Sequence, residues 1–312
     1  MKWKLKDLLD LDNLTNGEIE HILQTARPMK EILSRPIKKL PTLRGKSVVL
    51  LFYESSTRTR TSFESAAKIL GADTTNFTVA QSSITKGESL LDTAKTIQAM
   101  NVDLVVVRHS SSGAADFLAD TLKASIINGG DGQHAHPTQA LLDLFTIQEK
   151  IGQIKGKKIL IVGDILHSRV ARSNVIGLKK LGAEVTLVGP PTLLPPEMNY
   201  LGIKLSHDLD KELPGADVVM ALRLQLERQQ SGLFPSIREY NRLYGLSIAR
   251  IKKTEKQTII MHPGPMNRGV EIASDLADSV QSVIEEQVTN GVAIRMALIY
   301  LLIGGGTGNV VD

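Results

Sequence analysis

The residues between Ser55 and Arg60 are the first in the chain whose types and spacing suggest chemistry. Four hydroxyls and two arginines fall within six residues, Ser55-Ser56-Thr57-Arg58-Thr59-Arg60. Hydroxyls and backbone amides donate short hydrogen bonds to phosphate oxygens, and a guanidinium grips two oxygens at once, which lysine cannot do. An ordinary helix cap with solvated arginines is the alternative, but a cap needs only one hydroxyl. The segment therefore predicts a phosphate site.

The flanking sequence predicts that this segment opens a helix behind a buried strand. Residues 47–52, SVVLLF, form an unbroken apolar run that is typical of a strand covered on both faces. Phe63, Ala66 and Leu70 then recur at helical spacing, and Gly71 follows as a C-cap. The first turn of a helix carries free N–H groups and the positive end of the dipole, so a phosphate fits there.

Strand-like apolar runs alternate with helical patterns along the whole chain. They lie at residues 47–52, 75–79, 102–107 and 125–128, and again at 158–162, 184–188, 217–220 and 258–261. This rhythm predicts an α/β protein with two doubly wound parallel sheets. We expect one domain at residues 1–136 and another at 151–290, joined by a helix at 137–150 and followed by a last helix at 291–312.

Composition limits the class of protein. The chain has 312 residues, long for a single core, and its lack of cysteine excludes a disulfide framework, a thiolate zinc site and a cysteine nucleophile. A net charge of +4 and 4% aromatic residues do not suit nucleic-acid binding, which needs a basic stripe and stacking rings. Charges interrupt the N-terminal segment and every long apolar run, so we expect no signal peptide, no membrane span and a cytoplasmic location.

Polar side chains follow five of the predicted strands, where ligands collect in sheets of this kind. They are Arg108-His109, residues 129–139, Gly163-Asp164 with Arg169 beyond, Arg223-Leu224-Gln225, and residues 262–265. Taken singly, a strand-end arginine is most often part of a surface ion pair. Neither the G-x-G-x-x-G spacing of a dinucleotide site nor a P-loop sequence occurs.

Four motifs in their order and spacing resemble the aspartate/ornithine carbamoyltransferase family. They are residues 56–60, Arg108-His109, residues 136–139 and residues 262–265, and the similarity covers essentially the whole chain. Ornithine-specific members place cysteine in the last two segments, and this chain has none. Lys86-Gly87-Glu88-Ser89, after Ser82-Ser83, also matches the mobile loop of the aspartate branch.

The resemblance implies a reaction and an assembly. The carbamoyl group of carbamoyl phosphate would pass to the amine of L-aspartate, giving N-carbamoyl-L-aspartate and phosphate for de novo pyrimidine (UMP) biosynthesis, with no metal or organic cofactor. The helix at 291–312 would pack back on the first domain. Active sites would be shared in a homotrimer, and regulatory chains or a dihydroorotase could associate. An ornithine-type carbamoyltransferase of the same family is the alternative.

The resemblance also assigns roles to residues. Carbamoyl phosphate would be bound by Ser56, Thr57, Arg58, Thr59, Arg108, His136, Gln139, the carbonyls of Pro263 and Gly264, and Ser82 and Lys86 of a neighbouring subunit. Aspartate would be bound by Lys86, Arg169, Arg223, Gln225 and Pro263. The catalytic residues would be Arg58, Thr59, Arg108, His136 and Lys86, whose donors stabilise the oxyanion. Glu54 would close the domains by pairing with Arg169 and Arg228.

Two other classes of protein remain open. A binder of phosphate or amino acids without catalysis would use the same anion sites but would leave the oxyanion donors unexplained. A metal-dependent hydrolase could use His134, His136 and His262. Pro137 directly after His136, and the lack of a nearby carboxylate-rich motif, weaken that hypothesis, so we expect no metal.

Overall fold

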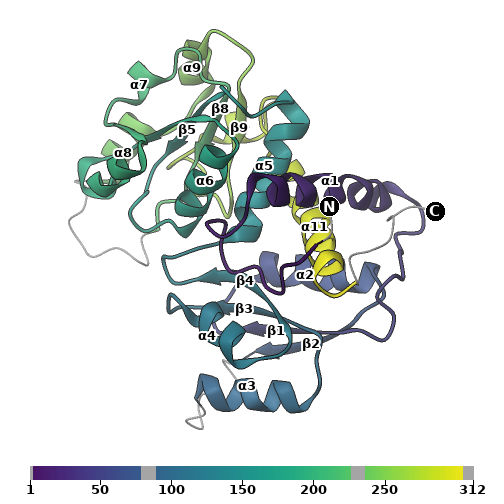
Figure 1. Ribbon diagram of the computed structural model, residues 1–312. Coiled ribbons are helices and arrows are strands. Elements are labelled where there is room, and N and C mark those ends of the chain that lie inside the picture. The colour runs from purple at the N-terminus through teal and green to yellow at the C-terminus, as the bar shows by residue number, and fades with distance from the viewer. Residues whose placement is uncertain (1–2, 79–88, 226–235, 305–312) are drawn as a thin grey trace. The chain divides into compact units, whose positions relative to one another are not determined.

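The computed structural model describes residues 3–78, 89–225 and 236–304, and it divides into two compact units (Figure 1). The first unit comprises Met1–Leu142 and Thr289–Asp312, and the second comprises Asp143–Val288. The chain crosses between the units twice, each time within a helix, first in α5 (Pro137–Ile151) and then in α11 (Ile284–Ile303). The expected fold class, two α/β units joined by helices, is confirmed.

The first unit contains a parallel sheet in the order β2-β1-β3-β4. The strands are β1 (Ser47–Phe52), β2 (Asp73–Thr78), β3 (Leu104–His109) and β4 (Ser125–Asp131). Val49, Leu51 and Val107 pack on one face of the sheet against α3 (Leu90–Ala99) and α4 (Ala114–Thr121). The alternate side chains face the other way, towards the side on which Figure 1 shows α1 (Asn16–Ser34), α2 (Thr57–Ile69) and α11.

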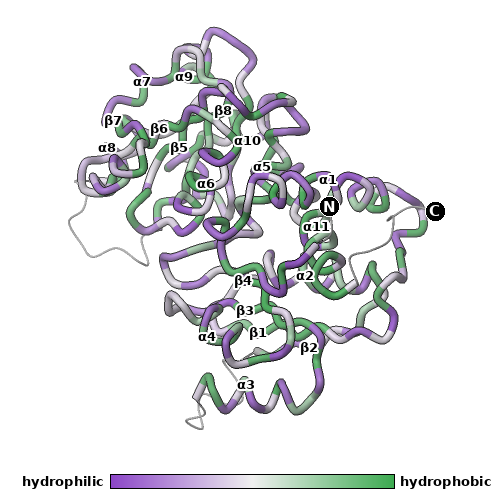
Figure 2. Tube along the Cα trace, in the orientation of Figure 1, coloured by the Kyte–Doolittle hydropathy of each residue, from purple (hydrophilic) through white to green (hydrophobic). Residues whose placement is uncertain are grey.

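The second unit contains a parallel sheet in the order β7-β6-β5-β8-β9. The strands are β5 (Lys158–Val162), β6 (Glu184–Val188), β7 (Lys204–Ser206), β8 (Val218–Ala221) and β9 (Ile259–Met261). Its helices are α6 (Arg169–Lys180), α7 (Leu209–Glu212), α8 (Ile237–Tyr244), α9 (Ile248–Ile251) and α10 (Ser274–Ala277), with short 3-10 turns η3 (Pro191–Leu193), η4 (Pro196–Leu201) and η6 (Lys252–Thr254). Hydrophobic residues concentrate on the strands of both sheets (Figure 2).

The C-terminal helix returns to the first unit, as the resemblance implied. Its residues Ile294 and Leu298 are fully buried, and the Arg295 guanidinium lies 5.0 Å from the centre of the Phe63 ring on α2. The helix begins at Ile284, earlier than the expected 291. The sequence did not indicate this earlier start, because the first turn carries Glu285 and Glu286 and so lacks an apolar pattern. Among the described residues, no helix has the length and apolar character needed to cross a membrane.

Candidate active site

The phosphate motif lies at the start of α2, as the sequence predicts. Ser56 is the N-cap residue, and its hydroxyl makes no capping hydrogen bond. Elsewhere in the described chain, Thr15 and Ser89 close complete capping boxes with their hydroxyls. The Ser56 hydroxyl is thus not used to cap this helix, which argues against the ordinary capping alternative.

Arg58 and Thr59 occupy the first turn of this helix. The Arg58 side chain is accessible to solvent, yet the surrounding protein desolvates its guanidinium enough to lower the pKa below the ordinary arginine value. Thr59 is buried, and its carbonyl accepts a hydrogen bond from Ser62 Oγ at 2.9 Å. A partly desolvated cation at the positive end of a helix favours a bound anion.

Arg108 stands beside the phosphate motif because of strand register. It pairs with Phe52 across β1 and β3, and its carbonyl accepts the Tyr53 amide at 2.8 Å. The side chain is buried; Nη1 donates to Gly129 O at 3.1 Å, and Nη2 donates to Glu54 Oε1 at 2.6 Å. Glu54 thus has a partner within its own unit, whereas its expected partners Arg169 and Arg228 belong to the second half. That cross-domain pairing stays a prediction.

His136 completes this cluster in the first unit. Its Nε2 lies 3.5 Å from Arg108 Nη1, and Gln139, one turn further on, is buried as well. The loop before His136 is shaped by Asp131, whose Oδ1 accepts from Asn128 Nδ2 at 2.7 Å and from the Ala135 amide at 3.1 Å. Asp131 was not singled out from the sequence, because its partners are set by the fold of the loop.

The metal hypothesis finds little support in the first unit. In the described part of the chain, the grouping of possible metal ligands consists of Asp116, Asp131 and His134, without His136 or His262. Asp131 Oδ2 already accepts the Gly113 amide at 2.7 Å and faces His134 Nδ1 at 3.0 Å, while Oδ1 is occupied as described above. A carboxylate with these donors serves as a structural acceptor.

In the second unit, three neighbouring strands bring the predicted aspartate ligands to one edge of the sheet. Arg169 follows β5 as the first residue of α6, and Arg223 and Gln225 follow β8, which pairs with β5. Arg169 is buried, and the preceding Ser168 caps α6 by accepting the Ala171 amide at 3.1 Å. Gly163, between β5 and α6, has φ 133°, and a Cβ there would lie 2.9 Å from Tyr240 Oη. Only glycine fits this turn.

The third strand end carries the loop at residues 262–265. His262 is buried directly after β9, which pairs with β8, and its Nδ1 accepts the Gly264 amide at 2.8 Å. Gly264 has φ 60°, a conformation that favours glycine. Pro263 and Gly264 are half-buried, so they are accessible as the expected backbone ligands.

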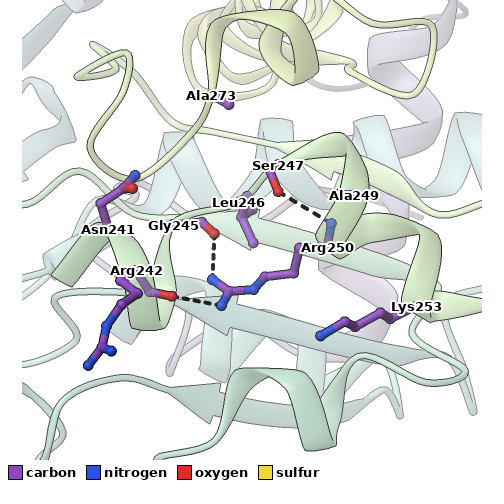
Figure 3. A pocket seen from close by; sticks show the side chains of 9 residues that line it. All are labelled: Asn241, Arg242, Gly245, Leu246, Ser247, Ala249, Arg250, Lys253 and Ala273. Carbon is purple, nitrogen blue, oxygen red and sulfur yellow. Dashed lines mark hydrogen bonds between the residues drawn. The ribbon is translucent and has the colours of Figure 1, made fainter. Parts of the chain in front are cut away.

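Figure 3 shows a surface hollow of about 390 Å³ in the second unit, and none of the predicted site residues lines it. Arg250 crosses it, donating to Gly245 O at 2.7 Å and to Arg242 O at 2.8 Å at the end of α8, and it pairs with Asp210 at 2.9 Å. These bonds satisfy the last carbonyls of α8, so the arginine has a structural role.

The structure thus gathers Ser56, Thr57, Arg58, Thr59, Arg108, His136 and Gln139 in the first unit, and Arg169, Arg223, Gln225, Pro263 and Gly264 in the second. Ser82, Lys86 and Arg228 lie outside the described residues. Glu271 and Gln287, which contact His262, were missed by sequence reasoning because neither belongs to a motif.

Each unit has a parallel sheet with cationic side chains beyond its strand ends, and the first unit has an anion site at a helix N-terminus. These features define a two-domain enzyme that acts on anionic small molecules. Residues 6–149 match the carbamoyl phosphate-binding domain of aspartate/ornithine carbamoyltransferases, and residues 155–302 match the domain that binds aspartate or ornithine. The chain belongs to the aspartate/ornithine carbamoyltransferase family.

Relatives named for either amino acid share the fold of this chain. The chain is 71% identical to an aspartate carbamoyltransferase catalytic subunit of Desulfitobacterium hafniense over 100% of both chains. It is 61% identical to that of Moorella thermoacetica, over 98% of this chain and 99% of the relative. The Trypanosoma cruzi aspartate transcarbamoylase, solved with carbamoyl phosphate and aspartate, has a TM-score of 0.86 at 28% identity, with 96% and 98% of the two chains covered. A Pyrococcus furiosus ornithine carbamoyltransferase also has a TM-score of 0.86, at 31% identity over 98% and 99%.

Proposed function

We propose that this chain transfers the carbamoyl group of carbamoyl phosphate to the amine of L-aspartate. It is an aspartate carbamoyltransferase, since relatives that match its full length at 71% and 61% identity are catalytic subunits of that enzyme. The observation that carries the mechanism is the cluster formed by the start of α2, Arg108 and His136. Because the ornithine enzyme has the same fold, the amino-acid substrate must be read from side chains.

The residues of the first unit would bind and activate the electrophile, carbamoyl phosphate. The first-turn amides of α2, the hydroxyls of Ser56 and Thr57, and Arg58 would bind the phosphate. Arg108 and His136, held 3.5 Å apart, would direct donors at the carbamoyl oxygen together with Thr59. These donors stabilise negative charge on that oxygen when the aspartate amine attacks the carbon.

The chemical step needs positioning more than acid–base groups. The amine nitrogen forms a bond to the carbamoyl carbon, the bond from that carbon to the phosphate oxygen breaks, and the leaving phosphate takes the amine proton. Gln139 and the carbonyls of Pro263 and Gly264 would accept from the carbamoyl NH₂. Orientation of two bound reactants and electrostatic stabilisation of the oxyanion supply the rate enhancement.

Arg169 and Arg223 would bind the two carboxylates of aspartate, with Gln225 beside them. Their positions beyond the paired strands β5 and β8 support this assignment. Ornithine has a cationic tail, which would face a guanidinium at a cost of several kcal/mol where water is excluded.

We expect a cytoplasmic homotrimer in which Ser82 and Lys86 enter the neighbouring subunit's site. The relatives are named catalytic subunits, which leaves room for regulatory chains or a dihydroorotase as partners. A native mass measurement distinguishes these assemblies.

The experiment that tests the proposed function compares aspartate with ornithine as acceptor. Wild-type protein should carbamoylate aspartate and leave ornithine essentially unchanged. Arg223→Ala should lose at least about tenfold in kcat/KM for aspartate, because a charge-assisted hydrogen bond contributes about 1.5–3 kcal/mol. If the wild-type protein uses ornithine as well as aspartate, the assignment within the family is wrong.

A further inference from the structure

We infer that Glu271 is a positioning residue that acts through His262 to present the carbonyls of Pro263 and Gly264 to the NH₂ group of the substrate. This inference rests on the proposed function and adds to it the basis on which a carbamoyl group is preferred to other acyl groups.

The loop has one backbone N–H to offer over residues 263–265. Pro263 and Pro265 have no amide hydrogen, and the amide of Gly264 donates to His262 Nδ1 at 2.8 Å. With its N–H committed to His262, this backbone segment can offer a ligand only carbonyl oxygens. Such a surface accepts hydrogen bonds from a donor such as the carbamoyl NH₂, and it makes no hydrogen bond to a methyl group in the same place.

The tautomer of His262 follows from the same bond. Because Nδ1 accepts the Gly264 amide, the neutral ring carries its proton on Nε2, which donates to Glu271 Oε1 at 3.2 Å. The same carboxylate oxygen accepts the amide of Asn267. Glu271 therefore holds the ring in the one tautomer that can fix Gly264, and it also holds the chain beyond the loop.

The backbone of His262 is held by a second series of hydrogen bonds. Its amide donates to Gln287 Oε1 at 3.0 Å, and Gln287 Nε2 donates to Asp143 Oδ1 at 2.8 Å. Asn174 Nδ2 donates to the other oxygen of Asp143 at 2.8 Å. All five side chains in this network are buried, so water does not compete for these bonds.

A purely structural role for the pair is the alternative, and the second oxygen of Glu271 argues against it. Glu271 Oε2 is buried and has no hydrogen-bond partner in the part of the chain that the structure describes. Burying an incompletely satisfied carboxylate is unfavourable for stability, and apolar side chains often replace such pairs without loss. A buried pair with this unfavourable contribution, in contact with the loop at residues 262–265, is better explained by orientation of that loop.

The test compares three anions that share a phosphate and differ in the attached group. Inorganic phosphate needs only the phosphate site at the start of α2. Acetyl phosphate adds a carbonyl and a methyl group, and carbamoyl phosphate adds a carbonyl and an NH₂ group. Their dissociation constants are measured by calorimetry on the full chain with saturating succinate, the dicarboxylate that lacks the reacting amine. Wild-type protein should bind carbamoyl phosphate about 10- to 100-fold more tightly than acetyl phosphate, since one or two hydrogen bonds distinguish them.

Glu271→Ala should reduce this preference to less than about threefold and leave the other two dissociation constants within about threefold of wild type. Glu271→Gln keeps an oxygen that accepts from His262 and Asn267, and it should restore most of the preference. Asp278→Asn is the matched control, because it breaks an exposed ion pair of 2.7 Å with Arg268 on the same stretch of chain. It should leave all three constants unchanged.

His262 supplies a second pair of variants that does not depend on Glu271→Ala folding. The oxygen of asparagine can take the place of Nδ1 and accept the Gly264 amide, whereas the amide of glutamine replaces Nε2 and reaches only Glu271. His262→Asn should therefore keep a larger preference for carbamoyl phosphate than His262→Gln. Equal losses for all three anions in Glu271→Ala, or equal preference in the two His262 variants, would overturn the inference. A wild-type protein that carbamoylates no aspartate would instead overturn the proposed function.

Discussion

Replacing Arg108 by alanine is expected to lower kcat/KM for carbamoyl phosphate by about 10²–10⁴-fold while the chain stays folded. The side chain is 10% exposed and stands beside the start of α2 through the pairing of Phe52 with Arg108. Two charge-assisted bonds to the substrate, at about 1.5–3 kcal/mol each, give about 3–6 kcal/mol. At about 1.4 kcal/mol for each factor of ten, this corresponds to the stated range.

The effect of the same change on stability should be smaller. Alanine removes the Nη2 donor from Glu54, whose side chain is 24% exposed and can therefore accept from water instead. It also removes the donor to Gly129 O. We expect a loss of about 1–2 kcal/mol in the free energy of unfolding, which thermal denaturation would detect without loss of the folded state.

Initial rates at varied carbamoyl phosphate and saturating aspartate measure the catalytic effect. Arg108→Lys is the matched control, because lysine keeps the positive charge but cannot bond Gly129 O, Glu54 and a substrate oxygen from one planar group. Its activity should lie between those of wild type and alanine. A folded Arg108→Ala protein with kcat/KM within tenfold of wild type would refute the assignment of Arg108 to the substrate.

Two further predictions concern domain closure and assembly. Glu54→Ala should raise the KM for aspartate and lower turnover with little loss of carbamoyl phosphate binding, because Arg108 keeps its place on β3. Small-angle scattering with a bisubstrate analogue should show less compaction of the variant than of wild type. Equal compaction with unchanged aspartate kinetics would exclude a role of Glu54 in domain closure. In the proposed homotrimer, the Lys86→Gln and Arg58→Ala proteins should each be nearly inactive. Reassembled mixtures of the two should regain activity if sites are shared, whereas verified hybrids as inactive as their parents would place Lys86 outside the neighbour's site.

The strands were predictable because burial on both faces leaves an unbroken apolar run. β1, β5 and β6 have the bounds expected from sequence. β7 was not expected, because Lys204–Ser206 is short and partly exposed at the sheet edge. The early start of α11 was also missed, since acidic residues stabilise the first turn of a helix but do not form the apolar pattern that indicates a buried face.

The candidate site was predictable as a set of strand ends, since parallel strands deliver their carboxyl ends to one edge. Its internal bonds were not. The hydrogen bond from Arg108 to Glu54, which strand register makes possible, was not expected, and the pairing of Glu54 with the other half of the chain stays a prediction. Gln287 and Asp143 are separated by 144 positions, and only the completed fold brings them together behind His262. Long-range polar pairs of this kind leave no periodic signal in a sequence.

The path of the chain determines the order in which the two units can be finished during synthesis. The second unit is a continuous segment, Asp143–Val288, and the hydrogen bond between Asp143 and Gln287 ties its two ends together. The first unit, although its strands are made first, lacks α11 until the ribosome has passed residue 303. Arg295 stacks on Phe63 of α2, the helix that begins with the phosphate motif. A nascent chain should therefore complete its second unit before its first, and it should acquire a finished phosphate site only after residue 303 has been made.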